Sequence, residues 1–200
     1  MPRQKQSTER FLLWIDAVGG YLVCPGDEVV LGQAIPTARI EVPIFGDLST
    51  RHAAIRREGE GYVLVAMAPV IVNQRPVRSL CMLKDGDDIQ LGDSVRLQFR
   101  RPHALSMTAR LDFVSRHKTQ PSGDGVLLMA DSCVLGPKSR SHVICKDWTD
   151  EVVLFRQEKK LQCRVRGDVE IDGRRRKQGG PITKNSHVAG EDFSFSLEEI

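Results

Sequence analysis

Short apolar or alternating runs recur along the chain, notably at residues 21–24, 28–31, 39–42, 62–65, 71–73 and 94–99. Turn-forming residues separate them, at 19–20, 25–27, 59–61 and 85–86. No long stretch places apolar residues at helical spacing between capping residues. Short strands at regular intervals with turn chemistry between them predict an all-β chain built as a sandwich or barrel.

The second half of the chain repeats the first in the same order. The matching segments are 12–16 with 109–113, 21–32 with 126–136, 40–42 with 143–145, 71–75 with 170–174, and 89–99 with 187–197. Each copy spans about 90 residues, a normal size for a small sandwich domain. We therefore predict two tandem antiparallel β-sandwiches, residues 9–101 and 106–200. Pro102 suits the boundary because proline cannot donate to a strand ladder, and the polar segment 115–125 is expected to be a loop inside the second copy.

Composition narrows the class of protein. The chain of 200 residues is 40% hydrophobic and 28% charged, which favours a folded core over disorder. A net charge of +3 is too small to argue for nucleic acid. No apolar run is long enough to cross a bilayer, and the patch at residues 11–15 is too short for the core of a signal peptide. We expect a cytoplasmic protein without a nucleic-acid or membrane partner.

The sequence offers little for metal, cofactor or covalent chemistry. The five cysteines are odd in number and form no Cys-x-x-Cys pair, so we interpret them as buried reduced thiols. Asp85, Asp87 and Asp88 lack the pattern of a calcium loop. No glycine-rich phosphate cradle or nucleophile–base arrangement is present, so we expect no metal, no cofactor and no catalytic residue. The basic run 174–177 follows a hairpin signal and is expected to be a solvated tip.

Two segments of the first copy carry the most specific signal. Residues 48–55 read Leu-Ser-Thr-Arg-His-Ala-Ala-Ile, and residues 83–92 read Leu-Lys-Asp-Gly-Asp-Asp-Ile-Gln-Leu-Gly. Ser49 and His52 would face opposite sides of a strand, so they cooperate only if Ser49 lies on a loop before the strand begins. Together the segments resemble the landmarks of forkhead-associated (FHA) domains, small β-sandwiches that bind phosphothreonine peptides. The resemblance spans residues 29–99.

The resemblance implies roles for six residues of the first copy. Ser49 would donate its hydroxyl to a phosphate oxygen, with Thr50 as a secondary contact, and His52 would brace the loop through side-chain hydrogen bonds. Gln33 and Arg39 would line the entrance, and Arg51 and Arg39 could supply positive charge. The alternative is that both arginines are solvated surface residues. Arg56 and Arg57 are expected near the same loop end.

Departures from the family pattern leave two functions open. Gln33 stands where FHA domains usually carry an arginine, and replacing a charged hydrogen bond by a neutral one costs on the order of 1–2 kcal/mol. The usual Asn-Gly of a later loop is absent, and only residues 66–69 remain there. The second copy has lost the phosphate motif and carries carboxylates near residue 150. The chain is then a non-catalytic adaptor that binds a phosphorylated partner through its first copy, or a phospho-independent scaffold or self-association module, of undetermined oligomeric state.

Overall fold

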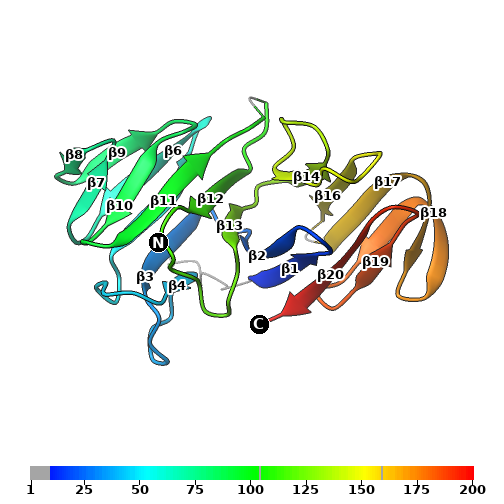
Figure 1. The fold of residues 1–200 in the computed structure, drawn as a ribbon, viewed down its shortest axis with the longest axis horizontal. Coiled ribbons are helices and arrows are strands. Elements are labelled where there is room, and N and C mark those ends of the chain that lie inside the picture. The colour runs from blue at the N-terminus through cyan, green and yellow to red at the C-terminus, as the bar shows by residue number, and fades with distance from the viewer. Residues whose placement is uncertain (1–9, 104, 159) are drawn as a thin grey trace.

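The computed structural model describes residues 10–103, 105–158 and 160–200. Residue 9, where the predicted first domain begins, and Ala104, near the predicted boundary, lie outside the described residues. The predicted all-β class is confirmed, since the described residues form strands and no helix (Figure 1). The first half contains β1 (Phe11–Ile15), β2 (Gly19–Cys24), β3 (Glu28–Gln33), β4 (Val42–Ile44), β5 (Ala53–Glu58), β6 (Gly61–Ala66), β7 (Val70–Val72), β8 (Arg75–Val77), β9 (Leu80–Leu83), β10 (Asp88–Leu91) and β11 (Val95–Arg100). The second half contains β12 (Ala109–Phe113), β13 (Gly125–Leu128), β14 (Ser132–Gly136), β15 (Val143–Ile144), β16 (Val152–Gln157), β17 (Lys160–Ile171), β18 (Arg174–Ile182), β19 (His187–Ala189) and β20 (Ser194–Glu199).

The strands form two sheets. A five-stranded sheet has the order β4-β3-β5-β6-β9. A 15-stranded sheet runs β15-β14-β16-β17-β19-β20-β1-β2-β13-β12-β11-β10-β7-β8, with β18 paired to β17 outside this path. The long sheet therefore passes through both halves of the molecule without a break.

Strand pairing in the second half repeats part of the pairing in the first half. β3 pairs with β4 in parallel and with β5 antiparallel, and β14 pairs with β15 and β16 in the same two senses. The predicted hairpin pair is present as β7–β8 and β17–β18. Both turns use two residues with positive φ, Asn73 and Gln74 in one and Asp172 and Gly173 in the other, as tight hairpins of matching twist require.

Two long strands of the second half each correspond to two strands of the first. β17 pairs with β16 at its start and with β19 at its end, just as β6 pairs with β5 and β7 with β10. An irregularity between Arg164 and Asp168 marks the point where β6 and β7 are separate in the first half. β18 likewise covers the positions of β8 and β9. The separation into two sheets is thus lost on this side of the second half.

The first hairpin of each half pairs with the last strand of the other half. β1 lies antiparallel to β20, and β12 lies antiparallel to β11. We call β1–β2 and β12–β13 the exchanged hairpins, because each pairs with the last strand of the other half. β2 and β13 pair in parallel and join these two hairpins at the centre of the long sheet. In Figure 1 the blue β1–β2 hairpin adjoins the red β20, while the green β12 and β13 follow β11.

The exchanged hairpins are buried on both faces. Leu12 and Leu22 pack into the core of the first half together with Leu111 of β12. Leu13 and Val23 point to the other side and pack into the core of the second half. A strand covered on both faces reads as a continuous apolar run rather than an alternating one, which accounts for the run from Phe11 to Leu13.

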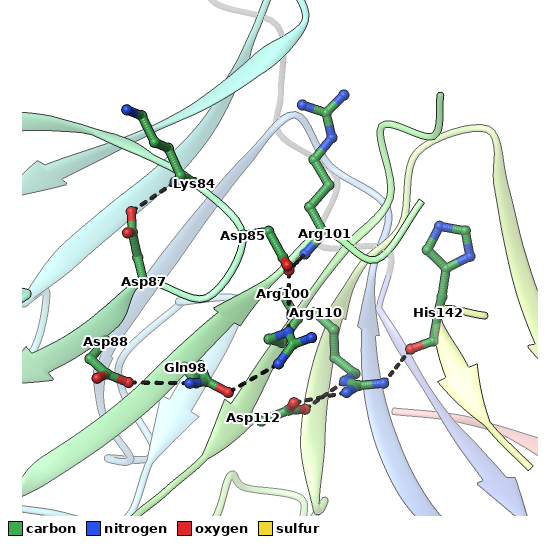
Figure 2. A network of polar contacts seen from close by, with 10 residues as sticks. All are labelled: Lys84, Asp85, Asp87, Asp88, Gln98, Arg100, Arg101, Arg110, Asp112 and His142. Atoms are coloured by element: carbon green, nitrogen blue, oxygen red, sulfur yellow. Dashed lines mark hydrogen bonds and ion pairs between the residues drawn. The ribbon is translucent and has the colours of Figure 1, made fainter. Parts of the chain in front are cut away.

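Arg110 on β12 connects the β12–β13 hairpin to His142 in the second half (Figure 2). The Arg110 guanidinium contacts the Asp112 carboxylate through Nε at 2.6 Å and Nη2 at 2.8 Å, and it donates to the backbone carbonyl of His142. Beside it on β11, Arg100 Nε contacts Asp85 at 3.2 Å. The Arg110–His142 contact thus joins β12 to the second half, whereas Arg100 and Asp85 both belong to the first half.

Candidate functional site

The His52 side chain forms hydrogen bonds with the loop that carries Ser49 and with Pro69. The Ser49 N–H donates to His52 Nδ1 over 3.2 Å, and His52 Nε2 lies 2.9 Å from the Pro69 carbonyl oxygen. Since Nδ1 accepts, the ring is a neutral tautomer that donates from Nε2. The imidazole is only 2% exposed, so it cannot itself reach a ligand at the surface. Its role is to position the Ser49 loop.

Gly32 allows this loop to approach β3 closely. A Cβ built on Gly32 would lie 2.1 Å from the Thr50 carbonyl oxygen, which leaves no room for any side chain. The Gln33 N–H donates to the Ser49 carbonyl at 3.0 Å, and the His52 N–H donates to the Leu31 carbonyl at 2.8 Å. The loop is thus fixed to the end of β3 on both sides of Thr50.

The two sequence landmarks meet at Pro69. Its carbonyl accepts from His52 Nε2 and also from the Gly92 N–H at 3.0 Å. Gly92, the last residue of the second motif, has φ +57, a conformation that glycine adopts without strain. The short segment before Pro69 is also tied down, because the N–H groups of Met67 and Ala68 both donate to the His52 carbonyl at 3.0 Å. The second motif and the short loop therefore support the first.

The predicted ligand-contacting side chains other than Gln33 lie at the surface. Three consecutive side chains are exposed, those of Ser49, Thr50 and Arg51. Arg39 is exposed on the β3–β4 connection, and Gln33 is half-buried at the end of β3. The Ser49 hydroxyl forms no hydrogen bond with any described residue. An unengaged hydroxyl beside the exposed Arg51, on a loop whose main chain is fixed, is suited to bind an anion. Arg39 was expected at the same loop end but lies away from it, because Glu41, two residues on, accepts from the Val30 N–H, three residues before Gln33.

Arg56 and Arg57 lie elsewhere. Both occupy the far half of β5, beyond the loop. Arg57 Nη1 contacts Asp27 at 2.7 Å, and Arg56 Nη2 contacts Glu58 at 3.0 Å. Their charges are balanced locally, so they do not contribute to the surface around Ser49.

The loop between β12 and β13 lies against β4, a contact that was not predicted from the sequence. The Phe45 N–H donates to the Lys118 carbonyl at 3.0 Å, and the Gln120 N–H donates to the Pro43 carbonyl at 2.9 Å. An isolated bridge joins Ile44 to Thr119. The segment was correctly expected to be a loop of the second copy. Its position against β4 follows from the hairpin exchange, for which the sequence carries no sign.

The equivalent position in the second half is occupied by carboxylates. Leu135 pairs with Val152 in the second half, and Leu31 pairs with Ala53 in the first half. Glu151, the residue before Val152, therefore takes the position that His52, the residue before Ala53, has in the first half. Glu151 lies close to Gly136 and contacts Lys138 at 3.3 Å. Asp150 contacts Arg166 at 3.6 Å. Negative charge at this end opposes phosphate.

The described residues give no support for metal or thiol chemistry. They contain no group of three or more His, Cys, Asp or Glu side chains placed to hold a metal ion. Burial raises the pKa of the Cys24, Cys133, Cys145 and Cys163 thiols to about 12, which keeps them protonated. All five cysteines are free, and Cys81 on β9 is half-buried. Within the same residues, no helix is long and apolar enough to cross a membrane.

The frame around Gly32, Ser49, His52 and Gly92 lies within the part of the first half that matches a protein-family model. Residues 29–92 match the FHA domain family model. The FHA domain is a phosphothreonine-binding protein-interaction module and is generally non-enzymatic.

Two solved FHA structures resemble part of the chain. No curated protein matches the chain. Among solved structures, the Rv0020c FHA structure is 26% identical with a TM-score of 0.30, covering 45% of this chain and 91% of that one. The FhaA FHA domain complexed with the intracellular domain of Rv3910 is 26% identical with a TM-score of 0.30, covering 41% of this chain and 91% of that one.

Proposed function

We propose that this chain is a non-catalytic cytoplasmic adaptor that binds a phosphothreonine-containing protein through its first half. The observation that carries the proposal is the Ser49 hydroxyl, unengaged and exposed on a loop whose main chain is fixed by His52 and Gly32. Ser49 would donate to the phosphate, with Thr50 as a secondary contact. Gln33 and Arg51 would line the phosphate, and His52 would act only through the loop.

The predicted domains, residues 9–101 and 106–200, would divide the work. The first would read phosphate, and the second would serve as a structural or docking part because Asp150 and Glu151 stand at its equivalent end. The family match over residues 29–92 supports this division, since it falls entirely within the first half.

Titration of phosphothreonine and plain threonine peptide libraries by fluorescence anisotropy tests the proposal. We expect the phosphorylated library alone to bind, and Ser49→Ala to weaken it about tenfold, the usual cost of one hydrogen bond to a charged group. Ser139→Ala is the matched control, since Ser139 is an exposed serine on a loop of the second half. Equal binding of both libraries, or equal effects of the two substitutions, would refute it.

The alternative is a phospho-independent scaffold or self-association module. Gln33 in place of arginine favours it, because the strongest phosphate contact of the family is missing. It predicts that Ser49→Ala has no effect in any partner assay while surface substitutions on the second half do.

A further inference from the structure

Sheet edges in this molecule are protected in different ways, with one exception. Unpaired edges invite another strand, and proteins block them with proline, charge, short length or a covering segment. β8 contains Pro76, β4 contains Pro43 and is bridged by Thr119, β18 carries the exposed run 174–177, and β15 has two residues. β9, with sequence Leu-Cys-Met-Leu, has no charge and no proline. Among the described strands it pairs with β6 alone.

The backbone of β9 turns polar groups to its outer side, where the Met82 carbonyl accepts from the Cys81 thiol at 3.5 Å. The Ala66 N–H donates to the Ser79 carbonyl at 2.8 Å, which makes Ser79 and Ala66 a hydrogen-bonded pair. Antiparallel partners alternate between bonded and non-bonded pairs. The next pairs are Leu80 with Val65, Cys81 with Leu64 and Met82 with Val63. Leu80 and Met82 are therefore the non-bonded positions, and their N–H and C=O groups point away from β6.

Apolar side chains surround this open edge. Leu80 is 61% exposed and Met82 55%, values unusual for large hydrophobic residues two apart on one strand. A groove of 530 Å³ runs between β8 and β9 and is lined by Pro76, Val77 and both exposed β9 residues. An extended strand could lie in this groove and hydrogen-bond to β9.

The same edge of the second half is closed. In the pairing of β17 with β18, Gln162 faces Pro181, at the position where Val63 faces Met82 in the first half. Proline has no N–H to offer to an added strand. The second half therefore carries proline at the position that the first half leaves open, and the strand pairing tolerates it.

The positive side chains along the groove between β8 and β9 favour a ligand with negative charge. Arg75, Arg78 and Lys84 line it and form no ion pair with any described residue. The carboxylate of Asp87, which also lines it, already accepts from the Lys84 N–H at 2.7 Å and from Asn73 Nδ2 at 2.8 Å. Three cations favour an acidic partner and oppose a second copy of this chain, which would bring the same charges together.

We propose that β9 is a docking edge for an extended segment of a partner protein in which apolar and acidic residues alternate. The segment adds a strand to the five-stranded sheet, with backbone bonds to Leu80 and Met82 and its carboxylates toward Arg75, Arg78 and Lys84. β9 and β4 are opposite edges of that sheet, so this surface is separate from the Ser49 loop. The proposal does not depend on phosphate recognition.

The test uses a short fluorescein-labelled peptide that alternates valine and glutamate, and its counterpart with lysine in place of glutamate. We expect the glutamate peptide alone to bind the full chain. Met82→Pro removes one outward N–H without touching the bonds to β6, and we expect binding to fall about tenfold or more. Arg78→Glu keeps the backbone and should weaken the glutamate peptide while improving the lysine peptide.

Two control variants separate strand addition at β9 from the loss of an apolar side chain and from binding at the Ser49 loop. Met82→Thr keeps the N–H and should retain more binding than Met82→Pro, and Ser49→Ala should leave the peptide's affinity unchanged. Circular dichroism melting verifies that each variant is folded, and Arg78→Glu decides the question if Met82→Pro is not. Equal binding of the glutamate and lysine peptides would overturn the proposal. So would binding that is unchanged in both Met82→Pro and Arg78→Glu. So would concentration-dependent dimerisation lost in Met82→Pro, which would assign the edge to a second copy.

Discussion

Gln33 stands at the position where FHA domains usually carry an arginine. Its backbone is already fixed by the Ser49 carbonyl, so an arginine at this position would start from the correct main-chain placement. Gln33→Arg should tighten binding of a phosphothreonine peptide about tenfold, because a charged donor replaces a neutral one. Isothermal titration calorimetry measures it, with Lys138→Arg on the equivalent end of the second half as the control. Unchanged affinity would argue that the phosphate does not sit beside Gln33.

Gly32 is a residue whose replacement should damage the fold directly. The Cβ of Gly32→Ala would meet the backbone carbonyl of Thr50, which cannot move without breaking the loop. We expect a loss of about 2 kcal/mol or more in the free energy of unfolding, measured with urea. Gly180→Ala is the matched control, because its Cβ would meet only Ile171 Cδ1 at 3.8 Å. Equal stability of the two variants would contradict the close approach of the loop to β3.

His142 links stability to pH at the junction of the halves. Burial, followed by His103 and Arg110 nearby, lowers the pKa of His142 to about 4. The ring is neutral when folded and takes up a proton more readily when unfolded. Its contribution, at most about 3 kcal/mol, is therefore complete above pH 6.5 and lost as the pH falls from 6.5 towards 4. Urea unfolding at a series of pH values should give a flatter profile across this window for His142→Gln, and a slope as steep as the wild type's would refute the assignment.

Sequence reasoning at this scale succeeded where contacts are local. Ser49 and His52 are three residues apart, and their bracing contact needs only a loop before β5. Arg56 and Arg57 were placed wrongly because their position depends on how far β5 extends and on Asp27, a partner 30 residues away from Arg57. The roles toward phosphate stay predictions for all five residues, namely Gln33, Arg39, Ser49, Thr50 and Arg51.

At the scale of elements, strands and hairpins could be predicted but some of their partners could not. The β7–β8 and β17–β18 hairpins follow from their turn residues, which act over two positions. The run from Phe11 to Leu13 reads as a strand, and its lack of alternation indicates burial on both faces. Nothing in the run says whether β1 pairs with β11 or with β20, because both last strands offer similar alternating surfaces. The choice is made by tertiary packing.

At the scale of the molecule, hairpin exchange should make the halves interdependent. A fragment of residues 10–103 would leave the face of β1 and β2 that carries Leu13 and Val23 without its core, and residues 105–200 would lack both strands. We expect each fragment alone to aggregate or bind a hydrophobic dye, and the co-expressed pair to form a one-to-one complex. Size-exclusion chromatography with light scattering measures this. Two soluble monomers with cooperative melting would instead support independent tandem domains.

The pairing of β1 with β20 also has a mechanical consequence. Phe11 lies opposite Glu199, so the first and last strands are joined at their outer ends. Tension applied through the two ends of the described chain would break the β1–β20 hydrogen bonds one after another, starting at Phe11 and Glu199, rather than all at once. Peeling of this kind needs little force, and it would strip β1 from the centre of the long sheet first. A pull on the flanking chain would therefore reach both cores at once.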